Sequence, residues 1–189
     1  MATTCDACGH KTNEVKSGSG IEPYGVRFIL KIETEEDLSR DVLKVFKLPD
    51  ENCKVFCNSI QSDTCAISIK ELELEVGAAA FGSRYTTVEG ILSTIKDELK
   101  LSNPLATGDS GDPLLKEKME SFLTKLDEII SGKWKVTLIL DDPCGNSYVQ
   151  SIHYPNPDTN LTVEKYKRSR EQDEELGLLD MKVENYEES

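Results

Sequence analysis

The 189-residue sequence predicts a mainly β fold into which a pair of helices is inserted. Three observations support this class. Segments with a two-residue hydrophobic period come first, two segments with helical spacing follow each other in the middle, and strand-like segments return after them. Because strands and helices do not alternate along the chain, this order favours an antiparallel β domain carrying a helical hairpin over a doubly wound parallel sheet.

The composition limits the classes of function. There are 35 acidic and 22 basic residues, which gives a formal net charge of −13. This charge argues against general binding to nucleic-acid phosphates, which requires clustered lysine and arginine. It favours a partner with a basic surface. No apolar run approaches the roughly 20 residues that cross a bilayer, so we expect no membrane span.

The first strands are expected around residues 26–32 and 67–76. Residues 26–32 alternate between apolar and other side chains in a strand-like period. Residues 35–44 are charged, with sparse apolar positions, and fit either a short helix or a loop followed by a strand. Within 67–76 the apolar positions change parity at Lys70 and Glu71, which predicts a bulge or a break there.

The helical hairpin has recognisable ends. Thr86 and Glu89 have the spacing of a capping box, in which the threonine accepts an amide proton and the glutamate reaches back. Apolar residues then recur at helical spacing. A second helix is expected to be capped by Asp112, to begin at Pro113 and to end before Gly132. The two apolar stripes should face each other in an antiparallel pair.

Strands return after the hairpin. Residues 134–140 form an apolar strand pattern, 141–147 are rich in turn-forming residues, and 148–152 fit a further strand. Residues 161–176 are predicted to carry a helical segment that begins near Thr162. The last ten residues are acidic, and we expect them to fray.

A pair of cysteines near the N-terminus predicts half of a metal site. Cys5 and Cys8 have the C-x2-C spacing of zinc ligands, but a closed structural site needs four ligands. A second pair at ribbon spacing is missing downstream, so we expect the partner pair to lie upstream of Met1. Two alternatives stay open: Cys53 and Cys57 complete the site at poor spacing, or Cys5 and Cys8 are reduced thiols on a loose arm. Reduced thiols are expected generally, since six cysteines occur without a secretory signal.

Two adjacent acids, Asp141 and Asp142, invite a catalytic or metal-binding interpretation. Neighbouring residues at a strand end point in opposite directions, and turn-forming residues follow at once. A structural turn in which an aspartate accepts backbone N–H bonds is therefore favoured. A contact between this turn and a partner remains an alternative, with these candidate residues: Asp141, Asp142, Gly145, Asn146 and Ser147.

A small basic cluster lies in the closing part of the chain. It consists of Lys165, Lys167, Arg168 and Arg170. Contact with RNA or an acidic partner is one interpretation. A solvated helix paired with neighbouring acids is favoured. No G-x-S-x-G elbow or phosphate loop is present, and nothing assigns a catalytic triad.

Five segments, in order, resemble the ZPR-one zinc-finger family of eukaryotes, and the match covers nearly the whole chain. The segments are CDACGHKTNEVKSG, YGVRFILKI, SRYTTVEGIL, DDPCGNSYVQ and YKRSREQDEELGLLDMKVENY. Family members carry two modules in tandem, each a finger followed by a domain. The motifs of this chain resemble those of the second module more than those of the first.

The resemblance implies a domain plan. Residues 1–20 would be the distal half of a four-cysteine eIF2-type zinc ribbon, with zinc as cofactor. Residues 21–160 would form a double-stranded β-helix with the helical hairpin at about 86–131. Residues 161–189 would be a helical closing segment and an acidic tail. Residues 45–61 depart from the family pattern and look like an insertion.

The resemblance also implies a function. It suggests a non-enzymatic chaperone for translation elongation factor 1-alpha, acting in cytoplasm and nucleus. The client would contact the β domain and the exposed faces of residues 88–100 and 113–131. The alternative is an adaptor that binds growth-factor-receptor (receptor tyrosine kinase) tails or nuclear RNA-biogenesis complexes. A metal-dependent hydrolase would need an open zinc site with three protein ligands, and the sequence shows an isolated cysteine pair.

Overall fold

The computed structural model describes residues 2–4, 11–13, 21–44, 65–77, 84–102 and 113–179. The predicted insertion at 45–61 and the acidic last ten residues lie outside these ranges. The elements are β1 (Ala2–Thr4), β2 (Lys11–Asn13), β3 (Gly25–Ile32), α1 (Glu35–Leu38), β4 (Asp41–Lys44), β5 (Ala66–Ile69), η1 (Lys70–Leu72), β6 (Leu74–Val76), β7 (Arg84–Thr87), α2 (Val88–Ser102), α4 (Pro113–Ile130), β8 (Val136–Asp142), β9 (Tyr148–Val149), β10 (Leu161–Tyr166) and α5 (Arg170–Glu175).

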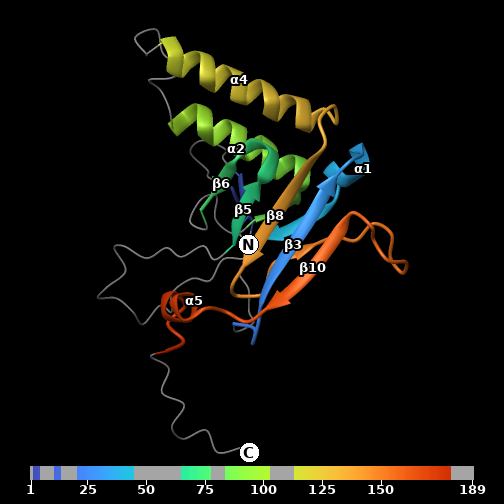
Figure 1. Ribbon diagram of the computed structural model, residues 1–189, viewed down its shortest axis with the longest axis vertical. Helices are drawn as coiled ribbons and strands as arrows, with labels where there is room; N and C mark the ends of the chain where they lie inside the picture. The colour runs from blue at the N-terminus through green and yellow to red at the C-terminus, as the bar shows by residue number, and fades with distance from the viewer. Residues whose placement is uncertain are drawn as a thin grey trace, which may run out of the picture.

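Two sheets form the β domain. The larger has the strand order β10-β3-β8-β5-β6 and the smaller has the order β7-β4-β9, while β1 and β2 form a separate pair. Every pairing between described strands is antiparallel. The helices α2 and α4 are inserted between β7 and β8 in the chain (Figure 1). The predicted antiparallel β fold with an inserted helical hairpin is thus confirmed.

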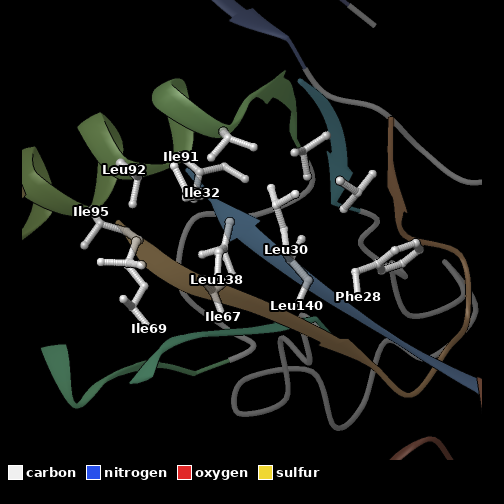
Figure 2. Close-up of a cluster of buried hydrophobic side chains, with 14 of the residues drawn as sticks. Phe28, Leu30, Ile32, Ile67, Ile69, Ile91, Leu92, Ile95, Leu138 and Leu140 are labelled. Carbon is white, nitrogen blue, oxygen red and sulfur yellow. The ribbon is translucent and has the colours of Figure 1, made fainter. Parts of the chain in front are cut away.

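The core lies between the larger sheet, the smaller sheet and α2. Alternate residues of β3 and β8 point inward and pair across the strands, with Phe28 opposite Leu140 and Leu30 opposite Leu138. The α2 side chains Ile91, Leu92 and Ile95 lie over this surface, as Figure 2 shows. Each fully buried side chain of this size contributes about 1.5–3 kcal/mol to folding, so the sheet and α2 form the stable centre of the domain.

The break predicted within residues 67–76 is present. Strands β5 and β6 form a tight antiparallel hairpin, with Ile69 opposite Leu74. The 3-10 turn η1 connects them, and Glu73 has a left-handed φ of 50°. The Glu71 carboxylate accepts a bond from the backbone N–H of Thr137 at 2.8 Å, beyond the last β5–β8 pair. The change of parity therefore marks the turn of a hairpin.

The helical hairpin forms as predicted, but its N-cap is one residue later than expected. The backbone N–H of Gly90 donates to the Thr87 hydroxyl at 3.1 Å. Thr86, the predicted cap, instead pairs with Val42 in the smaller sheet. Thr87 pairs with Asp41 in the same ladder, so the start of the helix at Val88 decides that Thr87, the residue directly before it, is the N-cap. The end of α4 at Gly132 follows the prediction, since this glycine has a positive φ of 69°.

The predicted helical segment beginning near Thr162 is wrong. Residues Leu161–Tyr166 are strand β10, which pairs along the length of β3, and a helix begins only at Arg170. Most β10 side chains are exposed, so no buried apolar stripe holds this segment as a helix. Pairing with the free edge of β3 decides the local structure, because tertiary context overrides a weak helical pattern.

Candidate functional site

The turn after β8 is organised by a buried carboxylate. Asp142 is fully buried, and its oxygens accept backbone N–H bonds from Cys144 at 3.0 Å, Asn146 at 2.9 Å and Ser147 at 2.8 Å. This is the structural turn that the sequence favoured. A carboxylate held by several backbone donors fixes loop geometry and is not exposed for acid–base chemistry.

Asp141 points to the opposite face of the larger sheet. It accepts two bonds from the Arg27 guanidinium, at 3.1 and 2.6 Å, and one from the Tyr166 hydroxyl at 2.6 Å. The Arg27 guanidinium also lies 5.2 Å from the centre of the Tyr166 ring. Burial, and then the hydrogen bond to Asp141, raise the pKa of Tyr166. The two adjacent acids are therefore separated by the sheet and do not form a paired acidic site.

The remaining turn candidates are also enclosed. Gly145 has a φ of +76°, and a Cβ there would lie 2.5 Å from the carbonyl oxygen of Tyr24. Ser147 is buried, while Asn146 is half-buried. The turn thus packs against residues 21–24, at the start of the β domain. A contact between this turn and a partner stays a prediction.

A buried ion cluster was missed by sequence reasoning. Arg40 is fully buried and donates to Asp37 Oδ1 at 3.0 and 2.7 Å and to Asp158 Oδ2 at 2.5 Å. It also donates to the Gln150 carbonyl at 3.0 Å. Asn160 adds a side-chain bond to Asp37 at 3.1 Å. The cluster ties α1 to the 150–160 loop, so its role is structural.

The cluster lowers the pKa values of both of its aspartates, Asp37 and Asp158. The hydrogen bond from Arg40 is the main cause that lowers the pKa of Asp158 to about 2. Burial alone would raise the pKa of Asp37, but hydrogen bonds from Arg40 and from the backbone of Glu33 and Thr34 lower it overall. The local signals were Thr34 three residues before Asp37 and Arg40 three residues after it. The decisive partners lie more than 100 residues away in the chain.

The hairpin carries exposed apolar side chains at one end. Leu101, near the end of α2, is 74% exposed, and Leu114 and Leu115, at the start of α4, are 67% and 47% exposed. The helices run antiparallel, so these residues lie at the same end of the hairpin (Figure 1). Single exposed leucines are common, but a group of them indicates a contact surface.

A second exposed group lies on the smaller sheet. Tyr85 and Tyr148 occupy positions opposite Leu43 on its two neighbouring strands, and both tyrosines are about half exposed. The Tyr85 hydroxyl donates to Asp41 at 2.7 Å, and this bond raises the pKa of Tyr85. This pair was not predictable from the sequence, because β7 and β9 are placed on either side of β4 only by the fold.

The zinc-ligand candidates Cys5 and Cys8 lie outside the described residues. The strands on either side of them are described, and Thr4 of β1 pairs with Lys11 of β2. In the sequence, the two cysteines lie between these paired strands. Two thiolates suit zinc, and they would supply half of a four-ligand set.

Other cysteines and metal candidates are placed in the described ranges. Cys65 and Cys144 are buried, a setting in which cysteine packs as a small apolar residue. Within the part of the chain that the structure describes, no group of three or more His, Cys, Asp or Glu side chains is arranged to hold a metal ion. In the same ranges no helix has the length and apolar character needed to cross a membrane.

The basic cluster of the closing segment is divided by the structure. Arg168 donates to Asp173 Oδ1 at 2.8 Å and to two backbone carbonyls. Lys165, Lys167 and Arg170 are exposed. The predicted pairing with a neighbouring acid is thus present for Arg168. The predicted helical setting is wrong for residues 164–169, which are strand and coil.

Comparisons with known proteins agree with this architecture. The ZPR1 jelly-roll domain matches residues 56–178, and the ZPR1 zinc-finger domain matches residues 1–23. The chain is 46% identical over 187 residues to zinc finger protein ZPR1 of Homo sapiens, and 48% identical over 190 residues to that of Drosophila melanogaster. It is 42% identical over 187 residues to the zinc finger chaperone zpr1 of Schizosaccharomyces pombe.

These alignments cover 99%, 100% and 99% of this chain, respectively, and 37% of each relative. The chain therefore spans a little over a third of the length of these curated relatives. The jelly-roll match agrees with the two antiparallel sheets and with the β domain that the sequence motifs implied. Together, the fold, the C-x2-C segment and the two domain matches show that this chain belongs to the ZPR1 family.

Proposed function

We propose that this chain is a client-binding module of a chaperone for translation elongation factor 1-alpha, and that it catalyses no reaction. The name of the fission-yeast relative, a zinc finger chaperone, supports the general class. The observation that carries the proposal for this chain is the exposed apolar end of the helical hairpin. A partly folded client exposes apolar surface, and such surface binds to a matching apolar patch.

The hairpin is built to present this surface. Helix α2 lies between α4 and the sheets (Figure 1) and buries Ile91, Leu92 and Ile95 in the core. Helix α4 buries Leu126 and Ile129, both in its C-terminal half. Because these two residues hold α4 against the domain, its N-terminal half can expose leucines without weakening that packing. A rigid helix face reduces the entropy cost of binding.

Binding energy alone would do the work of the proposed chaperone. A module that binds one conformation of a client more tightly than the others shifts the client towards that conformation. The formal net charge of −13 would assist the encounter with a client segment of positive charge, because opposite charges steer association. No nucleotide chemistry is required for this mechanism.

A binding assay with matched variants tests the proposal. The double variant Leu101→Ser, Leu114→Ser removes the apolar end of the hairpin. The control Asp97→Ser, Glu120→Ser changes exposed residues of the same two helices. We expect the leucine variant to raise the Kd for elongation factor 1-alpha on the order of tenfold or more, since two buried leucines contribute at least about 1.4 kcal/mol.

The outcome is read by isothermal titration against denatured, refolding client and against native client. Equal affinity of both variants and the wild type would contradict a role for the hairpin end. A folded module that retains no elongation factor 1-alpha at all would contradict the choice of client.

The adaptor alternative is tested through the zinc-finger segment, which matches a zinc-finger domain. In that case the segment that contains Cys5 and Cys8 is the docking element. The variant Cys5→Ser, Cys8→Ser should then abolish binding to a receptor tail or nuclear complex. Retention of client binding by this variant supports capture by the β domain and hairpin.

A further inference from the structure

The zinc-finger match and the β domain meet in a short junction. The match ends at residue 23, and β3 begins at Gly25. Within this junction the backbone N–H of Glu22 donates to the carbonyl of Cys144 at 2.9 Å. The junction is thereby attached to the turn after β8, more than 100 residues away in the chain.

The junction backbone lies close to the turn after β8. A Cβ at position 145 would lie 2.8 Å from the Glu22 Cβ as well as 2.5 Å from the Tyr24 carbonyl oxygen. Only glycine leaves room for the junction backbone at this distance. The turn itself is held rigid by the hydrogen bonds that its backbone donates to Asp142. It therefore offers a fixed surface for the junction.

One side chain joins this contact to the closing segment. Arg168, whose side chain is 9% exposed, donates through Nη1 to the Glu22 carbonyl at 2.7 Å and to the Pro143 carbonyl at 3.0 Å. Its Nε donates to Asp173 Oδ1 at 2.8 Å. The guanidinium thus connects the junction, the turn and α5 through three acceptors.

We propose that Arg168 is a positioning residue that fixes the junction, so that the closing segment sets the direction in which the zinc-finger segment leaves the β domain. A guanidinium suits this role because its planar donors have a fixed geometry, which a lysine ammonium lacks. The hydrogen bond to Asp173 orients the guanidinium, and the carbonyls of Glu22 and Pro143 accept its other hydrogen bonds. The other basic residues of the cluster are exposed and serve as internal controls.

Amide hydrogen exchange on the intact chain tests this role without any client. The probe is the Glu22 amide, whose bond to Cys144 is lost when the junction opens. We expect Arg168→Ala to speed exchange at Glu22 about tenfold or more, since bonds from a charged donor contribute about 1.5–3 kcal/mol. Asp173→Asn should act in the same direction by a smaller factor.

The control is Arg170→Ala, which removes an exposed charge two residues away and should leave exchange at Glu22 unchanged. Amides of the central strands, such as Leu30 and Leu138, report whether the domain stays folded. Faster exchange in the junction with unchanged exchange in these strands supports the proposal. Unchanged exchange at Glu22 in Arg168→Ala, or an equal effect of Arg170→Ala, would overturn it. The result does not depend on which client the module binds.

Discussion

At the residue scale, the buried charged side chains of the described ranges fix backbone geometry. Asp142 holds the turn after β8, and Arg40 holds α1 against the 150–160 loop. A buried arginine that keeps two carboxylates ionised is costly to desolvate, and removal of one partner leaves an uncompensated charge. These groups are therefore expected to resist substitution because they hold the fold together.

The Asp158 carboxylate should make folding depend on pH in the acid range. Its pKa falls from 3.8 to about 2 in the folded state, chiefly through the hydrogen bond from Arg40. A lowered pKa contributes stability that is present above the unfolded value and is lost as the pH falls through the folded value. This contribution is about 2 kcal/mol at pH 7 and roughly half of that at pH 3.

Urea unfolding of the wild type and of Asp158→Asn between pH 7 and pH 2.5 measures this contribution. The difference in unfolding free energy between the two proteins should be largest above pH 5 and should shrink towards pH 2. Changes in the repulsion among other charges affect both proteins and cancel in the difference. For the control Glu117→Gln, which changes an exposed residue, the difference in unfolding free energy from the wild type should not change with pH. A difference that stays constant down to pH 2.5 would contradict the assigned role of Asp158.

The residue scale also shows what the sequence can reveal. The role of Asp142 was predictable, because its donors lie within five residues of it in the chain. The role of Arg40 was not, because Asp158 is 118 residues away. Local patterns carry no information about such a pairing, and a charged stretch is usually a solvated surface.

At the element scale, the sequence predicted which segments are periodic but not what those segments contact. The stripes of α2 and α4 and the strand pattern of β3 were correctly assigned. Strand β10 was assigned as a helix, because its structure depends on the free edge of β3. The N-cap of α2 is Thr87 and not Thr86, because strand β7 continues through Thr87 and the helix begins only at Val88.

The junction of β7 with α2 should show a coupling between two residues. A Cβ on Gly90 would lie 2.1 Å from the Thr86 hydroxyl oxygen. Alanine normally favours a helix over glycine by about 1 kcal/mol, but here the methyl group collides with this hydroxyl. We therefore expect Gly90→Ala to be more destabilising, by at least about 1 kcal/mol, in the wild type than in a Thr86→Ala background.

A double-mutant cycle measured by urea unfolding gives this coupling directly. The matched cycle combines Gly90→Ala with Thr94→Ala, which lies one turn further along α2. This second cycle should be close to additive, because the Thr94 hydroxyl donates to the backbone carbonyl of residue 90, which Gly90→Ala retains, and the three atoms nearest to the added Cβ belong to Thr86 and Thr87. Additive behaviour in the cycle with Thr86 would contradict the close packing of β7 against the first turn of α2.

At the scale of the whole molecule, the order of elements was predictable and the sheet assignments were not. The sequence showed strands, a helical pair and strands again, which excluded a doubly wound sheet. It could not show that β10 and β3 are neighbours, or that β4 and β9 belong to a second sheet. Pairings between distant strands are decided by the packing of the complete core.

We expect the zinc-finger segment and the β domain to be separate folding units, because the β domain has an apolar core of its own. The members of this core lie between Val26 and Val149, on both sheets and on the helices α1, α2 and α4. Metal binding contributes to folding where the ligands themselves organise the core. We therefore expect removal of zinc to leave the stability of the β domain nearly unchanged.

Thermal unfolding with and without a chelator, followed by circular dichroism, tests this independence. The Tm of the β-sheet transition should change by less than about 2 °C, which corresponds to less than about 1 kcal/mol for a chain of this size. As a positive control, Leu138→Ala removes a fully buried side chain and should cost about 2–5 kcal/mol. A chelator effect as large as that of Leu138→Ala would contradict the separation, because it would mean that metal bound near Cys5 and Cys8 supports the sheets. A small effect, combined with faster junction exchange in Arg168→Ala, would mean that the β domain folds without the metal and that the Arg168 guanidinium holds the junction to it.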